Sequence, residues 1–340
     1  MSQPTDPTVA HCWEDFNQER YVQRSLDNEV AAWLNGTDVT RRRPLLSLVG
    51  PPGVGKSWLL GKLRQAQVEQ GRFVVLLKAP DLLDPTKHET IKLDLVQRAR
   101  TSCRSLVYPD LLLPPLPGLI ADLARKLCAR CPDEQFLVLV DGCDDLASQE
   151  EFDHVQREYL QRFFADPCFR MIVARRLDLT DPRLRPLSKM QSVSVFEQPE
   201  AESQREMLNQ ENWPSFQVEC TYRWNHPYIN CYLLAVHASG QPITTETLTA
   251  CCYSLIERAG LGNPIRHHNG RDHLRELKHI AKKLSARWTS TEYRATIGRD
   301  LEYTDKQYSL MNNVSQQPDE ISPTYTIVDG LRELLRALPD

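Results

Sequence analysis

A glycine-rich octapeptide constrains the fold more than any other segment of this 340-residue chain. It reads Gly50-Pro51-Pro52-Gly53-Val54-Gly55-Lys56-Ser57 and fits the pattern G-x-x-x-x-G-K-[ST]. An apolar run, residues 44–49, precedes it, and a helical pattern that begins at Ser57 follows it. This strand–loop–helix context predicts a phosphate-binding loop, because glycines let backbone N–H groups approach a phosphate and the helix N-terminus adds a positive dipole.

The loop also predicts individual contacts to a purine nucleotide and its metal ion. Lys56 is expected to bridge the β- and γ-phosphates, and the hydroxyl of Ser57 to ligate Mg²⁺. The rest of the octapeptide and Trp58, in the first turn of the helix, complete the expected nucleotide contacts. ATP or ADP with Mg²⁺ is therefore the expected cofactor, and Lys56 also counts among the catalytic candidates.

A second Mg²⁺ ligand is expected from a carboxylate at the end of a neighbouring strand. The apolar run Phe136–Val140 ends at Asp141, which we assign to this role. Asp145 first, and Asp144 second, lie just beyond the strand, where an acid can orient or deprotonate the attacking water. The alternative for these two residues is an ordinary helix N-cap with acids in its first turn.

Apolar runs separated by helical patterns set the fold class of the first two hundred residues. Strands without polar alternation, joined by helices, indicate a parallel sheet covered on both faces, a three-layer α/β fold. The expected strands are 44–49, 73–77, 136–140, 169–173 and 191–196, and the expected helices are 57–70, 93–106, 119–129 and 151–164.

The pattern changes near residue 200, where helical segments replace the alternation of strands and helices. We predict four regions along the chain. Residues 1–43 form a helical segment that borders the adenine site, 44–200 a P-loop nucleotide-binding domain, 201–260 a helical lid domain, and 261–340 a winged-helix-like C-terminal domain.

The C-terminal region contains a basic segment, residues 266–299. Between residues 266 and 300 there are nine Lys and Arg residues against four Asp and Glu residues, 9 − 4 = +5, although the whole chain has a net charge of −4. An apolar stripe at helical spacing, which includes Leu277 and Leu284, leaves the basic residues on the remaining surface. One interpretation is contact with nucleic acid; the favoured one is a solvated helix face in a structural lid.

Composition and cysteine usage indicate a cytoplasmic protein that does not enter a membrane. The first thirty residues contain no apolar core of the length that a signal peptide needs, and no stretch of the chain approaches the 18 apolar residues of a membrane span. The ten cysteines are then expected to be free thiols rather than disulfides.

Taken together, these motifs resemble the STAND class of signalling NTPases, which includes the NACHT and NB-ARC modules, over roughly residues 16–260. The loop and the acidic strand, Leu137-Val-Leu-Val-Asp-Gly-Cys-Asp-Asp145, carry most of the resemblance. Three shorter features add to it: Arg176 (or Arg175) after the fourth strand, Tyr21-Val22-x-Arg24 before the first, and Pro227 in the second domain. In the family these are a phosphate-sensing arginine, a motif bordering the adenine, and a proline against the base.

The resemblance implies a nucleotide-gated conformational and oligomerisation switch, with exchange of ADP for ATP as the trigger. It further implies microbial defence or programmed cell death, nucleotide-dependent self-assembly, and separate sensor and effector proteins as partners. Two departures matter: Asp145 replaces a glutamate, which predicts a slow ATPase, and Asn225 replaces the glycine two residues before Pro227. The alternatives are an AAA-type initiator or loader ATPase with a DNA-binding winged helix, and a scaffold with structural nucleotide.

Overall fold

The structure is a computed structural model in which a defined set of residues is described, and every structural statement below concerns these residues. They are 21–36, 44–50, 53–104, 106, 113–131, 134–146, 148–164, 168–175, 188–193, 197, 199, 200, 202, 203, 226–229, 232, 236, 244–260, 270–284, 288–298, 311–313, 324–327, 332, 335, 336 and 338.

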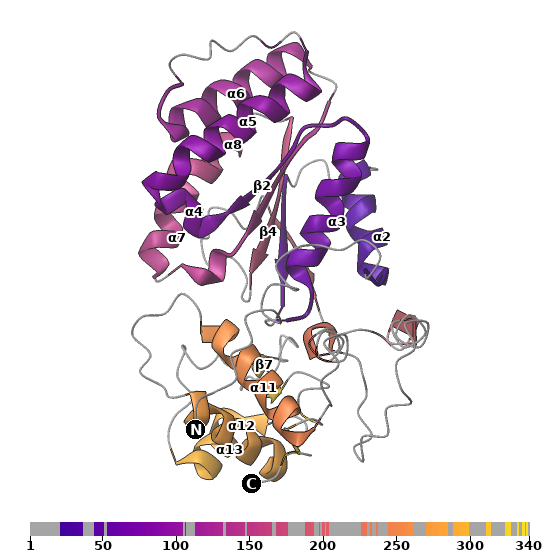
Figure 1. The fold of residues 1–340 in the computed structure, drawn as a ribbon, viewed down its shortest axis with the longest axis vertical. Helices are drawn as coiled ribbons and strands as arrows, with labels where there is room; N and C mark the ends of the chain where they lie inside the picture. The colour runs from indigo at the N-terminus through magenta and orange to yellow at the C-terminus, as the bar shows by residue number, and fades with distance from the viewer. Residues whose placement is uncertain are drawn as a thin grey trace.

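A five-stranded parallel sheet forms the centre of the N-terminal part (Figure 1). Its strands are β1 (Leu45–Val49), β2 (Val74–Lys78), β3 (Phe136–Asp141), β4 (Phe169–Arg175) and β5 (Ser188–Ser192), in the order β2-β3-β4-β1-β5. The expected parallel α/β architecture is confirmed. The fifth strand begins at Ser188 rather than at residue 191, because its pairing with β1 places Ser188 opposite Leu45.

Helices cover both faces of the sheet, which gives the expected three layers (Figure 1). One face carries α2 (Ser25–Asn35) and α3 (Lys56–Glu69), and the other carries the remaining helices of the N-terminal part. These are α4 (Ala79–Leu83), a 3-10 turn at Pro85–Lys87, α5 (His88–Ser102), α6 (Leu116–Arg130), α7 (Gln149–Val155), a π-helical segment at Gln156–Leu160, and α8 (Gln161–Phe164).

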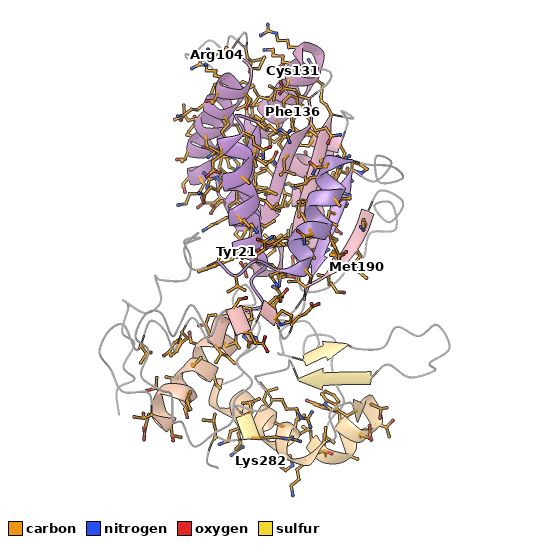
Figure 2. The ribbon with its side chains drawn as sticks, turned by 90° about the vertical axis from the view of Figure 1, so that its right-hand side faces the viewer. Tyr21, Arg104, Cys131, Phe136, Met190 and Lys282 are labelled. Atoms are coloured by element: carbon orange, nitrogen blue, oxygen red, sulfur yellow. A yellow bond between two sulfur atoms is a disulfide. The ribbon has the colours of Figure 1, made fainter. Side chains whose placement is uncertain are left out.

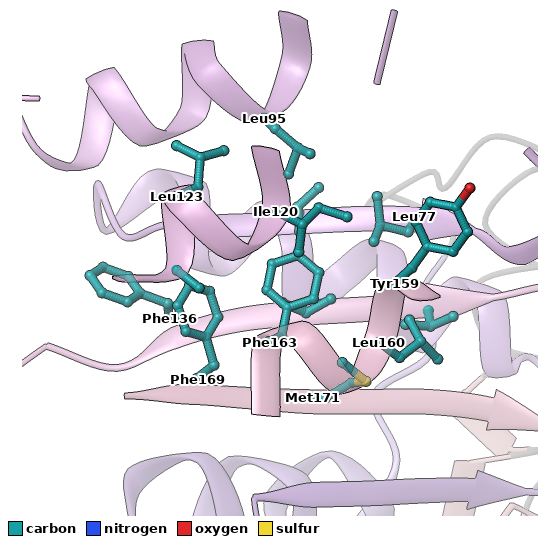
Figure 3. Close-up of a cluster of buried hydrophobic side chains, with 14 of the residues drawn as sticks. Leu77, Leu95, Ile120, Leu123, Phe136, Tyr159, Leu160, Phe163, Phe169 and Met171 are labelled. Carbon is teal, nitrogen blue, oxygen red and sulfur yellow. The ribbon is translucent and has the colours of Figure 1, made fainter. Parts of the chain in front are cut away.

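Successive strand residues enter different cores, as the pleat of a strand requires. Phe136 and Val138 of β3 pack under α5, α6 and α8, whereas Leu137 and Leu139 pack under α2 and α3. Figure 3 shows the first of these cores, where Phe136 lies close to Phe169 with ring centroids 5.3 Å apart. This two-sided burial explains why the strands are apolar throughout.

Helix α6 is clearly amphipathic. In α6, Leu119, Leu123 and Leu127 recur every four residues and are buried, while Arg125 lies on the exposed side. Among the described residues, no helix combines the length and the apolar character needed to cross a membrane.

The C-terminal part contains helices and a small antiparallel sheet. The helices are α11 (Thr245–Gly260), α12 (Gly270–Lys283) and α13 (Ser290–Ile297). The strands β6 (Trp288–Thr289), β7 (Met311–Asn313) and β8 (Thr324–Ile327) pair antiparallel in the order β6-β8-β7. A helix, a short strand, a second helix and two antiparallel strands follow one another as in a winged helix. The boundaries of the four predicted regions stay a prediction.

One cysteine pair differs from the expectation of free thiols. Cys128, in the last turn of α6, forms a disulfide with Cys168, which directly precedes β4, and their Cα atoms are 5.8 Å apart. Cys103, Cys131, Cys143, Cys251 and Cys252 are thiols outside any disulfide. The pairing was not predicted because the two residues are 40 positions apart and meet only when α6 packs on the sheet.

Candidate functional site

The carboxyl ends of three adjacent strands bring the predicted site residues to one edge of the sheet. β1 leads into Gly50, β3 ends at Asp141, and β4, which lies between β3 and β1, ends at Arg175. The backbone N–H of Gly50 donates to the carbonyl of Arg175 at 3.0 Å, which ties the loop to the central strand. In open parallel sheets the ligand binds at this edge.

The glycine-rich loop has the backbone of a phosphate cradle. Gly53 and Gly55 have φ values of 80° and 93°, in the left-handed region that glycine tolerates, and α3 begins directly afterwards at Lys56. The first N–H groups of a helix have no partner within the helix and carry its positive dipole, so the loop suits an anion. Lys56 extends back across the loop and its Nζ donates to the carbonyl of Gly50 at 2.6 Å.

The remaining loop residues lie around this cradle. Ser57 is exposed and Trp58 is half-buried, both in the first turn of α3, and Val54 is buried. Pro51 and Pro52 lie outside the described residues. Ser57, in the first turn of α3, and Asp141, the last residue of β3, lie at the same end of the parallel sheet.

The acids after β3 form a short turn of their own. Gly142 has a φ of 69°, and the N–H of Asp145 donates to its carbonyl at 3.0 Å, which closes the 3-10 turn Cys143–Asp145. Asp144 is buried, whereas Asp145 is exposed. The N-cap of the next helix is Ser148, whose Oγ accepts from the N–H of Glu151 at 3.2 Å. Neither acid therefore caps α7.

Of the two arginines considered for phosphate sensing, Arg175 is described and Arg176 lies outside the described residues. The Arg175 side chain is 5% exposed, and its Cζ lies 4.0 Å above the ring of Phe152. Its Nε and Nη1 have no hydrogen-bond partner in the described part of the chain. Burial raises the pKa of the Cys143 thiol, and the Arg175 charge lowers it, so the guanidinium lies near the acidic turn.

The segment before the first strand contacts the loop through Arg24. Its Nη1 donates to the carbonyl of Val54 at 2.7 Å, and its Nε lies 3.7 Å from Glu200. Glu200 also accepts from the N–H of Ser25 at 3.0 Å. Val22, two residues before Arg24, is buried. Arg24 thus joins the predicted adenine-bordering segment to the P-loop and to Glu200.

A second group of contacts around Asp27 fixes the same segment on α3. The hydroxyl of Tyr21 donates to Asp27 at 2.7 Å, and Lys62 Nζ lies 2.6 Å from Asp27 and 4.5 Å from the centre of the Tyr21 ring. Burial, together with the Asp27 charge, raises the pKa of Tyr21 well above its usual value. Sequence reasoning missed Asp27 and Lys62, although an acid three residues after Arg24 has the spacing of a capping box.

The second half of the chain, by which we mean the residues from 200 onward, contacts the P-loop at Gly53. The N–H of Tyr228 donates to the carbonyl of Gly53 at 3.1 Å. A Cβ built on Gly53 would lie 2.8 Å from His226 Cε1 and 2.9 Å from both Leu255 Cδ1 and Tyr228 Cβ. Pro227, the predicted base contact, is half-buried between His226 and Tyr228; Trp224 and Asn225 lie outside the described residues.

Comparison with known protein families and sequences gives two partial matches. The family described as "IstB-like ATP binding protein" matches residues 7–113. A curated relative, the "Insertion sequence IS1162 putative ATP-binding protein" of Pseudomonas fluorescens, is 38% identical over 73 residues, which are 22% of this chain and 31% of that protein. The aligned segment thus spans about a third of the relative's length.

Comparison with solved structures extends over nearly the whole chain. The Walker-type ATPase of Pyrococcus abyssi has a TM-score of 0.59 at 17% identity, with 96% of this chain and 99% of that chain covered. Cdc6p of Pyrobaculum aerophilum covers similar shares, 98% and 97%, but its TM-score of 0.38 at 12% identity is too low to indicate a shared fold. The first likeness and the five-stranded sheet show that this chain has a P-loop NTPase fold.

Proposed function

We propose that the protein is an ATP-binding, Mg²⁺-dependent ATPase of the AAA+ initiator or loader type, in which nucleotide controls how the second half of the chain sits on the P-loop. The contact between Tyr228 and the carbonyl of Gly53 carries this proposal, because a change in the loop on binding or release of phosphates acts directly on that contact. The partial match to ATP-binding proteins of the IstB type supports the AAA+ interpretation over the STAND interpretation.

Each site residue has a role that follows from its place at the sheet edge. Lys56 and the N–H groups at the start of α3 bind the phosphates, and Ser57 and Asp141 would hold Mg²⁺. Bound Mg²⁺ neutralises charge on the phosphate oxygens. Asp145, or the more buried Asp144, orients the attacking water, and the Arg175 guanidinium stabilises negative charge that develops on the transferred phosphoryl group.

The charge of α12 and its surroundings supports the proposal of a nucleic-acid partner. Arg275, Lys282 and Lys283 are exposed on this helix, while Leu277 and Ile280 are buried beneath it. Figure 2 shows Lys282 on the outer side of the C-terminal part, away from the sheet. Exposed cations on one face of a helix attract the phosphate backbone of DNA, and this attraction weakens with salt.

The test of the proposed function measures the binding of ATP and ADP, the binding of duplex DNA at several salt concentrations, and the rate of ATP hydrolysis with and without DNA. We expect the purified protein to bind ATP and ADP, and DNA to bind with an affinity that falls as salt rises. The double variant Lys282→Glu, Lys283→Glu should weaken DNA binding and leave the DNA-free hydrolysis rate unchanged. If ATP and ADP do not bind, the ATPase proposal is wrong; if they bind but DNA does not, the initiator or loader part is wrong.

The second candidate is the STAND-type signalling switch with separate sensor and effector proteins. One observation favours it: Pro227 lies between two residues that contact Gly53, which is where the resemblance expects a proline of the second domain. ATP-dependent self-assembly in the absence of DNA would support this candidate, whereas hydrolysis stimulated by DNA would support the first.

Replacement of Arg175 by methionine should separate catalysis from stability. We expect ATP hydrolysis to fall at least about tenfold, because the charge near the transferred phosphoryl group is removed. The free energy of unfolding without nucleotide should stay the same or rise, because a buried cation with two unpaired N–H groups is replaced by an apolar chain. Steady-state hydrolysis and urea unfolding measure the two effects; hydrolysis at the unmodified rate would exclude the catalytic role.

A further inference from the structure

His226 is a buried imidazole without a hydrogen-bond partner, in contact with the P-loop. Its side chain is 1% exposed, and neither Nδ1 nor Nε2 has a partner in the part of the chain that the structure describes. Buried polar atoms in proteins are nearly always hydrogen-bonded, because the bonds they lose to water must be replaced. Two unsatisfied nitrogens on one ring therefore require an explanation beyond packing.

The ring faces the loop through the edge that carries its nitrogens. Cε1, the carbon bonded to both Nδ1 and Nε2, lies 2.8 Å from the position of a Cβ on Gly53. Tyr228 donates its N–H to the carbonyl of the same glycine, so this placement is held by a hydrogen bond as well as by packing. On the N-terminal side, Arg24 contacts the carbonyl of the next residue, Val54. The imidazole thus borders Gly53 and Val54, the two loop residues that are contacted by Tyr228 and by Arg24.

The chemistry of the ring favours contact with the nucleoside of a nucleotide over contact with its phosphates. Burial lowers the pKa of His226 to about 3, so at neutral pH the ring is uncharged and offers one N–H donor and one acceptor. Phosphates are bound mainly by cations and by arrays of N–H donors, which Lys56 and α3 already provide. A neutral donor and acceptor instead match the edge of a purine or the hydroxyls of a ribose.

We propose that His226 hydrogen-bonds the nucleoside half of the bound nucleotide, through the purine edge or a ribose hydroxyl. The inference rests on the proposed function, since it requires a nucleotide at the P-loop. Through this hydrogen bond the second half of the chain contributes directly to the binding site. Bound nucleotide then stabilises the contact of Tyr228 and its neighbours with Gly53. Release of the nucleotide leaves the ring unsatisfied again and weakens that contact.

The test compares His226→Leu with the unmodified protein in three measurements. Affinity for ADP should fall about tenfold, the loss expected for one neutral hydrogen bond. Affinity for inorganic tripolyphosphate, which has no nucleoside, should not change. The thermal unfolding midpoint without nucleotide should not fall, because leucine removes two unsatisfied polar atoms from the interior. His226→Gln, which retains a donor and an acceptor, should recover most of the ADP affinity.

His88→Leu is the matched control, because its Nε2 makes a hydrogen bond of 2.9 Å with the carbonyl of Leu82, on helices that flank the sheet. It should lower the unfolding midpoint and leave ADP affinity unchanged, the reverse of His226→Leu. Affinity for 2′-deoxy-ADP then assigns the contact: a loss that disappears with this ligand places it at the ribose, and a loss that persists places it elsewhere on the nucleoside.

Two results would overturn the inference while the proposed function stands: equal ADP affinity of His226→Leu and the unmodified protein, or an equal loss for ADP and tripolyphosphate. Absence of ADP binding by the unmodified protein would instead reject the proposed function, and the inference with it. Should His226→Leu not fold, ¹⁵N spectra of the histidine rings in the unmodified protein decide. ADP must shift the His226 nitrogens and tripolyphosphate must not.

Discussion

Lys56→Ala should lower the affinity for ATP and ADP by more than about a hundredfold. Each hydrogen bond from a cation to a phosphate oxygen contributes roughly 1.5–3 kcal/mol, and 1.4 kcal/mol corresponds to a factor of about ten. Lys56 Nζ already lies across the loop, 2.6 Å from the carbonyl of Gly50, so its loss removes a cation that is positioned before the ligand arrives. Isothermal titration calorimetry with each nucleotide measures the effect.

The matched control for this variant is Lys126→Ala. Lys126 lies on α6 and pairs with Asp122 at 2.8 Å on the helix surface, an interaction worth at most about 1 kcal/mol, and it has no place in the site. We expect Lys126→Ala to bind nucleotide like the unmodified protein. If Lys56→Ala retained affinity within about threefold of that value, the glycine-rich loop would not be the main phosphate-binding element, and the assignment of α3 would have to change.

The parts of the molecule that the sequence predicts are those that depend on local pattern. The strand before Gly50, the helix after it and the strand that ends at Asp141 form as expected, because each is specified by a continuous run of apolar residues or by the glycine-rich turn. The fifth strand was shifted because Ser188-Lys-Met-Gln-Ser192 has little apolar signal, and only its pairing with β1 makes it a strand.

The contacts that join the two halves of the chain depend on tertiary structure and left no local signal. Ser25 and Glu200 are hydrogen-bonded although they are 175 residues apart in the sequence. Tyr228 is likewise hydrogen-bonded to Gly53, although the strands β2 to β5 lie between them in the sequence. Pro227 was predicted beside the nucleotide by resemblance, whereas its neighbours His226 and Tyr228, which make the contacts to the loop, were given no role of their own. A sequence pattern gives residue types and spacing, whereas the burial of the His226 ring nitrogens without a hydrogen-bond partner can be seen only in the folded structure.

Gly53→Ala should separate the second half of the chain from the P-loop and weaken nucleotide binding by about a hundredfold. Two costs add at this position. A φ of 80° is unfavourable for alanine by roughly 1–2 kcal/mol, and the new Cβ would lie within 2.9 Å of Leu255 and Tyr228 and closer still to His226. Tyr228 must then move, the hydrogen bond to the carbonyl of Gly53 is lost, and the loop no longer keeps the geometry of a phosphate cradle.

Gly71 and Gly298 allow the two costs of Gly53→Ala to be separated. Their φ values are 68° and 83°, close to that of Gly53, yet a Cβ on either would meet no atom within 4 Å. Gly71→Ala and Gly298→Ala should therefore lower the free energy of unfolding by roughly 1–2 kcal/mol and leave ADP affinity unchanged. Urea unfolding and calorimetric titration of all three variants make the comparison. If Gly53→Ala bound ADP as tightly as Gly298→Ala, contact between the P-loop and the second half would not govern nucleotide binding, and the nucleotide-controlled docking proposed here would be wrong.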